Sequence, residues 1–515
     1  MNLKLFNTLS KKLEPFVPLN ETIKIYACGP TVYNHPHIGN ARPAIVGDIL
    51  TRVLRTLFKK VIYVRNITDI DDKINAKAKE ENVSIEVIAL KYTKIYQENM
   101  RALNVLPPDI EPTVTQNIHS IIKMVSSLLE KKHAYEAENH ILFHVPSFKD
   151  YGNLSKRKKD EMIEGARVEV APYKKDPMDF VLWKPSKKEQ PGWESPWGRG
   201  RPGWHIECSS MIEAYLGESI DIHLGGNDLI FPHHENEIAQ SNCAHNGKPL
   251  SKYWIHNGFI SMDKEKMSKS VGNIILVNDI LKNFTGEAIR LAMLTAHYKQ
   301  PLNWNENLLV QANKNLENLY DIIGDEKNFN NVAPPKKFFN SLLNDLNTPE
   351  ALKELYELSK NKNAKDQLKS AANYLGILQL TKTEWINQRK KIKNIDQKKI
   401  QKLINDRDKA RKEKNFAEKN SEPVFLEYQT FRWLEHCGPN LDDHLKYRNK
   451  KEILYWKKND PIKILESFLL RKKIIIDNLL KIMKNLIKKK INLAFDYAKR
   501  SPFPKKEDIY KYLYK

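Results

Sequence analysis

The strongest constraint on the fold is a strand–helix–strand pattern close to the N-terminus. Residues 24–29, IKIYAC, are a short apolar run that predicts a strand. Residues 41–58 carry apolar side chains at intervals of three and four, which predicts a helix, and residues 60–69 predict a second strand. A βαβ unit of this length has parallel strands joined by a crossover. Because ligands bind at the carboxyl ends of such strands, we expect a site at the turn over residues 29–40.

The rest of the chain changes character several times. Residues 81–135 have a mainly helical pattern, and residues 146–203 are rich in Pro, Gly, Lys and Trp, which indicates an inserted, loop-rich segment. Strand patterns return at 219–224 and 253–262, and the pattern is helical from residue 278 onward. We therefore predict an α/β protein, in which a Rossmann-like parallel-sheet domain with an inserted connective segment is followed by an α-helical C-terminal half.

Composition excludes several classes of protein. Four cysteines in 515 residues are too few for a disulfide scaffold and indicate a reducing compartment. No apolar run approaches the ~18–20 residues of a membrane span, and the N-terminus lacks the pattern of a secretory signal. We therefore expect a soluble, cytoplasmic protein with no membrane partner. Lys and Arg number 85 against 63 Asp and Glu, and the net charge of +22 favours either a polyanionic partner or a solvated basic surface.

Residues 461–500 combine positive charge with helical periodicity. They hold 11 Lys and Arg against 3 Asp and Glu, and their apolar residues recur at spacings of three, four and seven. This pattern predicts a basic amphipathic helix. Three interpretations stay open: a helix packed on the body of the protein, a face that contacts RNA, and a segment that binds a membrane surface.

The turn before the first predicted helix contains the string HIGN, residues 37–40. A helix N-terminus offers unpaired N–H groups and a partial positive charge, which together suit a phosphate. Gly39 would let a nucleotide approach the backbone, and His37 could donate to a phosphoryl oxygen. Taken alone, a histidine in a loop is equally compatible with a structural role.

A second string, KMSKS at residues 266–270, follows the strand predicted at 253–262. Two lysines beside small hydroxyl residues can stabilise the charge of a phosphate group, although a solvated charged turn would look the same. Together the two strings resemble the signatures of class I aminoacyl-tRNA synthetases. The resemblance implies activation of an amino acid by ATP on a Rossmann-like fold, followed by esterification to tRNA. The first signature of that family ends in a second histidine, where this chain has Asn40.

Four residues far apart in the sequence have the chemistry of metal ligands: Cys28, Cys208, His233 and Glu237. A spacing of four places His233 and Glu237 on one face of a helix. Two thiolates, an imidazole and a carboxylate suit tetrahedral Zn²⁺. By themselves, four scattered candidates leave open the alternative of two buried, unpaired cysteines.

Longer strings are similar to one family of class I enzymes, the cysteinyl-tRNA synthetases. The strings are YACGPTVY (26–33), NITDIDDK (66–73), DPMDFVLWK (176–184), WHIECSSM (204–211) and FPHHENEIAQS (231–241). The similarity extends over roughly residues 1–420. It implies a monomeric enzyme that activates L-cysteine with ATP and Mg²⁺, forms cysteinyl-adenylate and transfers cysteine to tRNA(Cys).

The resemblance also assigns roles to individual residues by their match to the motifs of the family. It implies one Zn²⁺ per subunit, bound by Cys28, Cys208, His233 and Glu237. The residues implied in catalysis are His37, Asn40, Lys266 and Lys269. The residues implied in ATP binding are Pro30, His37, Gly39, Asn40, Gly226, Lys266, Met267, Ser268, Lys269 and Ser270. The residues implied in the cysteine pocket are Thr68, Trp204, His223 and Asp228, whereas His234, Cys243 and Cys437 are expected to be structural.

The chemistry of the substrate gives a reason for zinc. Cysteine and serine differ by sulfur for oxygen, and packing alone separates such substrates by only ~1–3 kcal/mol. Zinc lowers the pKa of a bound thiol and forms a Zn–S bond of about 2.3 Å, which a serine hydroxyl matches poorly. A metal that contacts the substrate's sulfur can therefore provide the discrimination that pocket shape cannot.

The resemblance fades near the C-terminus, where residues from about 420 onward do not follow the family. We expect five segments: 1–118, the first half of the catalytic domain; 119–200, the inserted connective segment; 201–315, the second half of the catalytic domain with the KMSKS loop; 316–400, a helical bundle; and 401–515, an anticodon-binding region with a divergent basic tail. Two alternatives are a ligase that joins cysteine to an amino sugar and a non-catalytic RNA-binding relative. The helical half and the basic tail favour tRNA over an amino sugar, and the intact signature residues favour an enzyme.

Overall fold

The computed structural model describes residues 2–157, 161–162, 172–262, 265–266, 274–361, 363–392, 455, 459–471 and 477–500. The chain divides into two compact units, Met1–Gln401 and Lys402–Lys515. Residues 393–454, within the part expected to be helical and including Cys437, lie outside the described residues, as does the string MSKS at 267–270.

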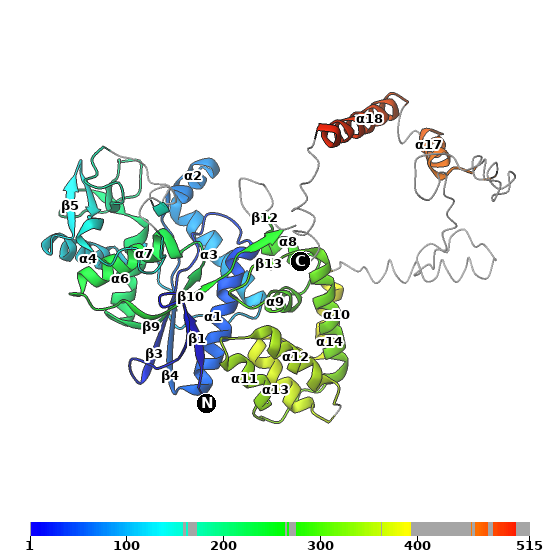
Figure 1. Cartoon of the computed structure of the whole chain (residues 1–515), viewed down its shortest axis with the longest axis horizontal. Helices are drawn as coiled ribbons and strands as arrows, with labels where there is room; N and C mark the ends of the chain where they lie inside the picture. Colours follow the sequence, from blue (N-terminus) through cyan, green and yellow to red (C-terminus); the bar gives the residue numbers. More distant parts are fainter. Residues whose placement is uncertain are drawn as a thin grey trace. The chain divides into compact units, whose positions relative to one another are not determined.

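The centre of the first unit is a four-stranded sheet in which every pair of neighbours is parallel, in the order β10-β9-β3-β4 (Figure 1). The strands are β3 (Thr22–Ala27), β4 (Lys60–Arg65), β9 (Ile220–Gly226) and β10 (Ser251–Asn257). In the register, Tyr26 is opposite His223, which in turn is opposite Trp254. The predicted βαβ unit and the α/β fold class are confirmed.

Helix α1 (Ile38–Leu57) joins β3 to β4 and packs against the sheet. Its apolar positions, among them Ala41, Ile45 and Ile49, are buried in one core with residues of β3 and β9. Pro43 lies inside the helix as its sixth residue, so it provides no N–H for the carbonyl of Gly39, one turn earlier. This packing fixes the start of α1 beside the carboxyl ends of the strands.

The inserted segment is more ordered than the composition predicts. It forms a second, antiparallel sheet in the order β5-β6-β7-β8, built from β5 (Ala134–Ala137), β6 (His140–Phe143), β7 (Phe180–Pro185) and β8 (Gly200–Pro202). Buried Phe143, Leu182 and Trp183 share a core with helices α4 (Ile118–Glu130), α6 (Trp204–Leu216) and α7 (Glu235–Ala244). Of these strands, β7 and β8 lie within residues 146–203, the range expected to be loop-rich, whereas β5 and β6 precede it.

The strand expected over 253–262 is two strands, separated by Gly258 and Phe259. Strand β10 ends at Asn257 and β11 (Ile260–Met262) begins a separate three-stranded sheet in the order β12-β11-β13. The other strands of this unit are β1 (Lys4–Asn7), β2 (Lys12–Pro15), β12 (Glu265–Lys266) and β13 (Leu302–Asn303). Other helices of this unit are α2 (Asp72–Glu81), α3 (Ile85–Ala102), η1 (Thr115–Asn117), η2 (Val145–Ser147), η3 (Ile230–His234) and α8 (Val277–Leu281).

The predicted helical half begins at Gly286. Its helices are α9 (Gly286–Leu294), α10 (Glu306–Ile323), α11 (Lys336–Leu343), α12 (Thr348–Ser359), α13 (Lys365–Leu375) and α14 (Lys382–Ile392). Side-chain caps begin four of them: Thr285, Asn305, Asn347 and Thr381 each accept a hydrogen bond from a backbone N–H of the first turn.

In the second unit, the described residues form α17 (Pro461–Arg471) and α18 (Asp477–Arg500). Lys484 Nζ lies 2.8 Å from Glu466 Oε2 and links the two helices. Several large apolar side chains are more than half exposed in the described part of this unit, including Ile462, Ile487 and Phe495. Among the residues described, no helix has both the length and the apolar character needed to span a bilayer.

Candidate active site

A cleft of about 470 Å³ opens where the strands of the central sheet end. Its walls come from the segment after β3, the start of α1, the end of β9 and the segment after β10. This is the position that a parallel sheet predicts for a ligand.

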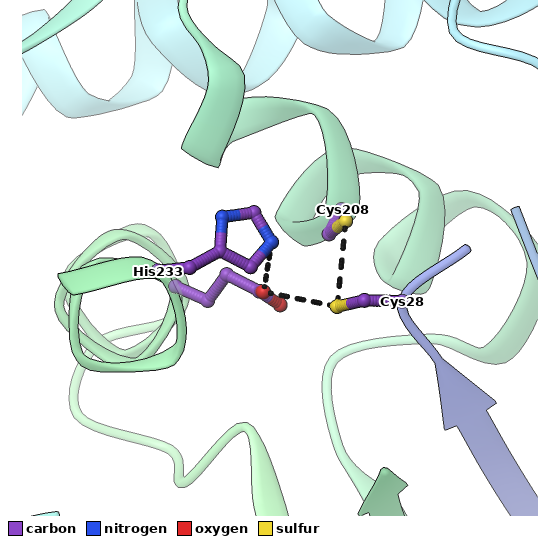
Figure 2. A group of neighbouring side chains, drawn as sticks. Cys28, Cys208 and His233 are labelled. Carbon is purple, nitrogen blue, oxygen red and sulfur yellow. Dashed lines mark hydrogen bonds and ion pairs between the residues drawn. The ribbon is translucent and has the colours of Figure 1, made fainter. Parts of the chain in front are cut away.

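The four expected metal ligands converge behind this cleft from four segments of the chain. Cys28 directly follows β3, Cys208 lies on α6, His233 lies in η3 and Glu237 lies on α7. One ligand atom from each residue lies within 4.8 Å of the others. Figure 2 shows the two sulfur atoms facing each other beside the imidazole of His233. Such proximity among residues up to 209 positions apart is a property of the fold, since the sequence gives only their types.

The distances within the cluster suit donors that share one centre. Cys28 Sγ lies 3.8 Å from Cys208 Sγ and 3.5 Å from Glu237 Oε1. His233 Nε2 lies 2.9 Å from the same carboxylate oxygen. Two thiols, an imidazole and a carboxylate are the donor set that zinc prefers, so the residues present fit that metal.

Burial and mutual contact shift the pKa values of these groups in different directions. A hydrogen bond from Cys28 lowers the pKa of the Cys208 thiol to about 6, whereas burial raises the pKa of Cys28. Burial opposes a charge on His233, but the Glu237 carboxylate outweighs it and raises the pKa of His233 to about 10. Burial also opposes the charge of Glu237, yet His223 and His233 hold its pKa well below the usual range. These shifts favour negative charge on Cys208 and Glu237 and a proton on His233, which a bound cation would displace.

A set of histidines surrounds the cluster and orients it. His205 Nδ1 lies 2.9 Å from His233 Nδ1, and His223 Nε2 lies 2.8 Å from Glu237 Oε2. His234 Nδ1 lies 2.7 Å from His256 Nε2. The other ring nitrogen of His256 contacts a threonine hydroxyl. Partners of this kind fix the orientation of ligand side chains.

His234 is closer to the cluster than the sequence indicated. Its Nε2 lies 3.4 Å from Cys28 Sγ, and Cys28, His223, His234 and Glu237 form a second group with ligand atoms within 4.8 Å. A Cβ at Gly225 would lie 2.5 Å from the His234 ring, so glycine lets β9 approach this imidazole. The two adjacent histidines at 233–234 are a sequence signal that a second histidine lies near the expected ligands. Helical periodicity, however, places only His233 on the same helix face as Glu237.

The HIGN string lies at the start of α1 and lines the cleft, together with Pro30. His37 is the N-cap residue, and its backbone N–H donates to Asn40 Oδ1 at 3.1 Å. The side chain of Asn40 thus closes the first turn with its oxygen and keeps its NH₂ group as a donor. Asparagine at this position therefore serves the helix as well as the cleft.

The backbone on either side of the lysine string is attached to the same helix start. Strand β12 contains the backbone of Lys266, whereas Met267, Ser268, Lys269 and Ser270 lie outside the described residues. After the string, Ile38 N donates to Ile275 O at 3.0 Å and Val277 N donates to Pro36 O at 2.9 Å. The chain thus returns to the HIGN segment by backbone hydrogen bonds.

The four residues expected to form the cysteine pocket are divided between two layers. Trp204 and Asp228 line the cleft with Gly226, and the Trp204 ring, 45% exposed, stacks on His233 at 4.4 Å between centroids. Thr68 and His223 are buried behind them, where Thr68 Oγ1 contacts Glu207 Oε2 at 3.4 Å. The structure therefore brings Trp204 and Asp228 to the open face and places His223 against Glu237, one of the expected ligands.

Comparisons with known proteins identify the family to which the sequence is similar. A family model described as "tRNA synthetases class I (C) catalytic domain" matches residues 15–314. The cysteine–tRNA ligase of Parvibaculum lavamentivorans is 54% identical over 433 residues, which cover 81% of this chain and 92% of that protein. The cysteine–tRNA ligase of Saccharophagus degradans is 50% identical over 431 residues, which cover 81% of this chain and 94% of that protein.

The C-terminal part of the chain is similar to a different family. A model described as "Dehydrogenase E1 component" matches residues 408–507, a stretch that contains α17 and α18. The match covers less than half of the chain and assigns it no activity. The start of this match, at residue 408, lies close to the boundary between the two compact units, at Gln401 and Lys402.

Proposed function

The chain belongs to the cysteine–tRNA ligases, a family of class I aminoacyl-tRNA synthetases, and we propose from this premise how its cleft binds cysteine and ATP. In the reaction, a carboxylate oxygen of cysteine bonds to the α-phosphorus of ATP and pyrophosphate leaves. A ribose hydroxyl at the end of tRNA then attacks the carbonyl carbon of the adenylate, and AMP leaves. Both steps need positioned reactants and stabilised charge more than covalent help from the protein.

Cys28, Cys208, His233 and Glu237 are proposed to hold one Zn²⁺ per subunit. When bound, zinc supplies a Lewis acid that prefers sulfur and favours the thiolate form of a thiol. The protein contributes a dry, preorganised donor set, because three of the four ligand residues are at most 3% exposed. Trp204, stacked on His233, closes the apolar side of the position where the substrate's sulfur would lie. Asp228 lines the same cleft and can pair with the substrate ammonium.

The start of α1 is proposed to bind the phosphates of ATP. The partial positive charge of the helix start attracts an anion, and His37 and Asn40 line the cleft at this position. Lys266 and Lys269 are proposed to stabilise the charge that develops on the departing pyrophosphate, with Mg²⁺ accompanying ATP. Pro30, Gly39 and Gly226 would allow the nucleotide to lie against the backbone.

The second substrate is proposed to be tRNA(Cys), bound by a monomer in the cytoplasm. The net charge of +22 supports attraction of the polyanion. Recognition of the anticodon by the region from 401 stays a prediction, as does the role of Thr68 in the cysteine pocket.

One observation carries the proposal: four residues with zinc-binding chemistry meet within 4.8 Å beside a cleft that the HIGN segment also lines. The test is ATP–pyrophosphate exchange driven by cysteine, followed by charging of tRNA(Cys). We expect exchange with cysteine and none with serine at equal concentration, and charging of tRNA(Cys). Exchange without charging of tRNA, but with a cysteinyl product on an amino sugar, would support the rival ligase. No exchange at all would support a non-catalytic relative.

A further inference from the structure

Arg42 is buried in the first turns of α1 and donates to main-chain carbonyl groups from two other segments. Nη1 donates to Gly258 O and Phe259 O, each at 2.8 Å. Nη2 donates to His297 O at 3.2 Å and to Gln300 O at 2.6 Å. The side chain is 2% exposed, and it lines the floor of the cleft that His37 and Asn40 also line.

The four acceptors join segments that meet beside the cleft. Gly258 and Phe259 link β10 to β11, and residues 297–300 form the turn before β13. Leu302 N donates to Phe259 O at 3.0 Å, and Trp304 N donates to Ser261 O at 2.7 Å. A Cβ at Gly258 would lie 2.5 Å from Gln300 O, so glycine permits this close approach. One guanidinium therefore holds both segments against α1.

The hydrogen bonds of Arg42 also attach to α1 the segment that leads into the lysine string. We call this segment, β11, and the segment after the string, residues 275–277, the two stems of the lysine string. After the string, the chain is tied to Pro36 and Ile38 by backbone hydrogen bonds. Before the string, β11 is tied through the carbonyls of Gly258 and Phe259 to Arg42, five residues after His37. Both stems thus depend on the same helix start.

All four partners of Arg42 are neutral peptide carbonyls. Burial lowers the pKa of Arg42 to about 10, so the guanidinium stays protonated at neutral pH. The planar fork of arginine supplies five N–H donors at fixed angles, whereas lysine has one ammonium group on a flexible stem. Lysine at this position would keep the charge but could not satisfy four carbonyls in two directions.

We propose that Arg42 is a positioning residue for amino-acid activation, which sets the β10–β11 junction and the stem of the lysine string relative to His37. The proposal rests on the proposed role of His37 and the lysine string in binding ATP. Because a displacement of about 1 Å can cost ~10²-fold in rate, loss of this clamp should lower the rate of activation without weakening cysteine binding.

The test compares three variants by cysteine-dependent ATP–pyrophosphate exchange, with zinc content measured on the same samples. Arg42→Ala should lower kcat by ~10²-fold, and Arg42→Lys by at least ~10-fold although it retains the charge. The KM for cysteine should stay within about twofold of the parent value, because the zinc ligands lie on other elements. Added guanidinium ion should restore part of the activity of Arg42→Ala and none of that of Arg42→Lys.

Arg290 provides a matched control because it is equally buried and also binds main-chain carbonyls. It donates to Leu375 O, Leu103 O and Asn104 O and pairs with Asp48, away from the cleft. Arg290→Lys should lower the melting temperature but leave kcat near the parent value at permissive temperature.

The proposal is overturned if Arg42→Lys behaves like Arg290→Lys, with reduced stability and an unchanged kcat. It is also overturned if Arg42→Lys has full activity while Arg42→Ala is impaired, since charge alone would then suffice. Failure of the parent enzyme to catalyse exchange would instead contradict the proposed function.

Discussion

The two ends of the cleft are built in different ways. The sulfur end, defined by Cys28, Cys208, His233 and Glu237, draws single side chains from four segments and surrounds them with histidines. The phosphate end is a helix start with backbone donors, to which the stems of the lysine string are tied. The sulfur end therefore depends on contacts among side chains, whereas the phosphate end depends on hydrogen bonds to backbone groups. Variants at the two ends should fail in different ways: loss of metal at one, loss of rate at the other.

The largest effect is expected from Cys208→Ser. Removal of a soft donor should release the metal and with it the ability to bind the thiol, so cysteine-dependent exchange should fall by more than the ~10²–10³-fold cost of one electrostatic contact. Metal analysis and exchange on the same sample check this. Cys243→Ser is the matched control, because Cys243 is buried on α7 but is in neither ligand group. A zinc-free Cys208→Ser enzyme with full activity would show that the sulfur end is not a metal site.

A smaller effect is expected at the phosphate end from Lys269→Ala. Loss of one charge that stabilises the departing pyrophosphate should lower the rate of activation by ~10²–10³-fold, while zinc content and the KM for cysteine stay unchanged. Lys264→Ala, which changes a lysine just before the string, should leave the rate near that of the parent. An equal loss in affinity for cysteine would contradict the separation of the two ends.

The next prediction tests whether His223 contacts the substrate cysteine directly or acts through Glu237. The sequence predicts that it contacts cysteine, whereas its Nε2 lies 2.8 Å from the ligand Glu237. If it acts through Glu237, His223→Gln should weaken zinc binding by ~10–100-fold, and added zinc should restore exchange. His245→Gln removes a similar contact, to Glu213 at 3.5 Å, and should leave zinc binding unchanged. A raised KM for cysteine with undiminished zinc affinity would favour direct contact.

The smallest effect on activation is expected from removal of the chain after residue 449. In sequence, this region is far from the residues at both ends of the cleft. If α17 and α18 contact tRNA through lysines, each lost phosphate contact should reduce the slope of log K against log salt by about 0.7–0.9. Exchange should survive, because every residue assigned to the cleft precedes residue 280. tRNA affinity at several salt concentrations, beside a thermal melt, checks this. An unchanged slope with a lower melting temperature would mean that these helices serve packing.

The sequence supplied candidates for both ends of the cleft because each candidate lies within a contiguous string that resembles a family motif; their roles in binding ATP and zinc stay predictions. It predicted the parallel sheet because the strand and helix periods differ clearly between residues 24 and 69. It could not place His205, His234 or His256, since their contacts join segments that only the fold brings together. It also missed Arg42, whose partners are backbone carbonyls that carry no signal in side-chain types.

The central claim is that the metal held by Cys28, Cys208, His233 and Glu237 contacts the sulfur of the substrate. Replacement of zinc by Co²⁺ makes the site visible by absorption spectroscopy, and cysteine can then be titrated in the absence of ATP. We expect a new sulfur-to-cobalt charge-transfer band that saturates with cysteine at one equivalent per chain and is absent with serine. A spectrum that cysteine leaves unchanged, in an enzyme that still catalyses cysteine-dependent exchange, would contradict the account.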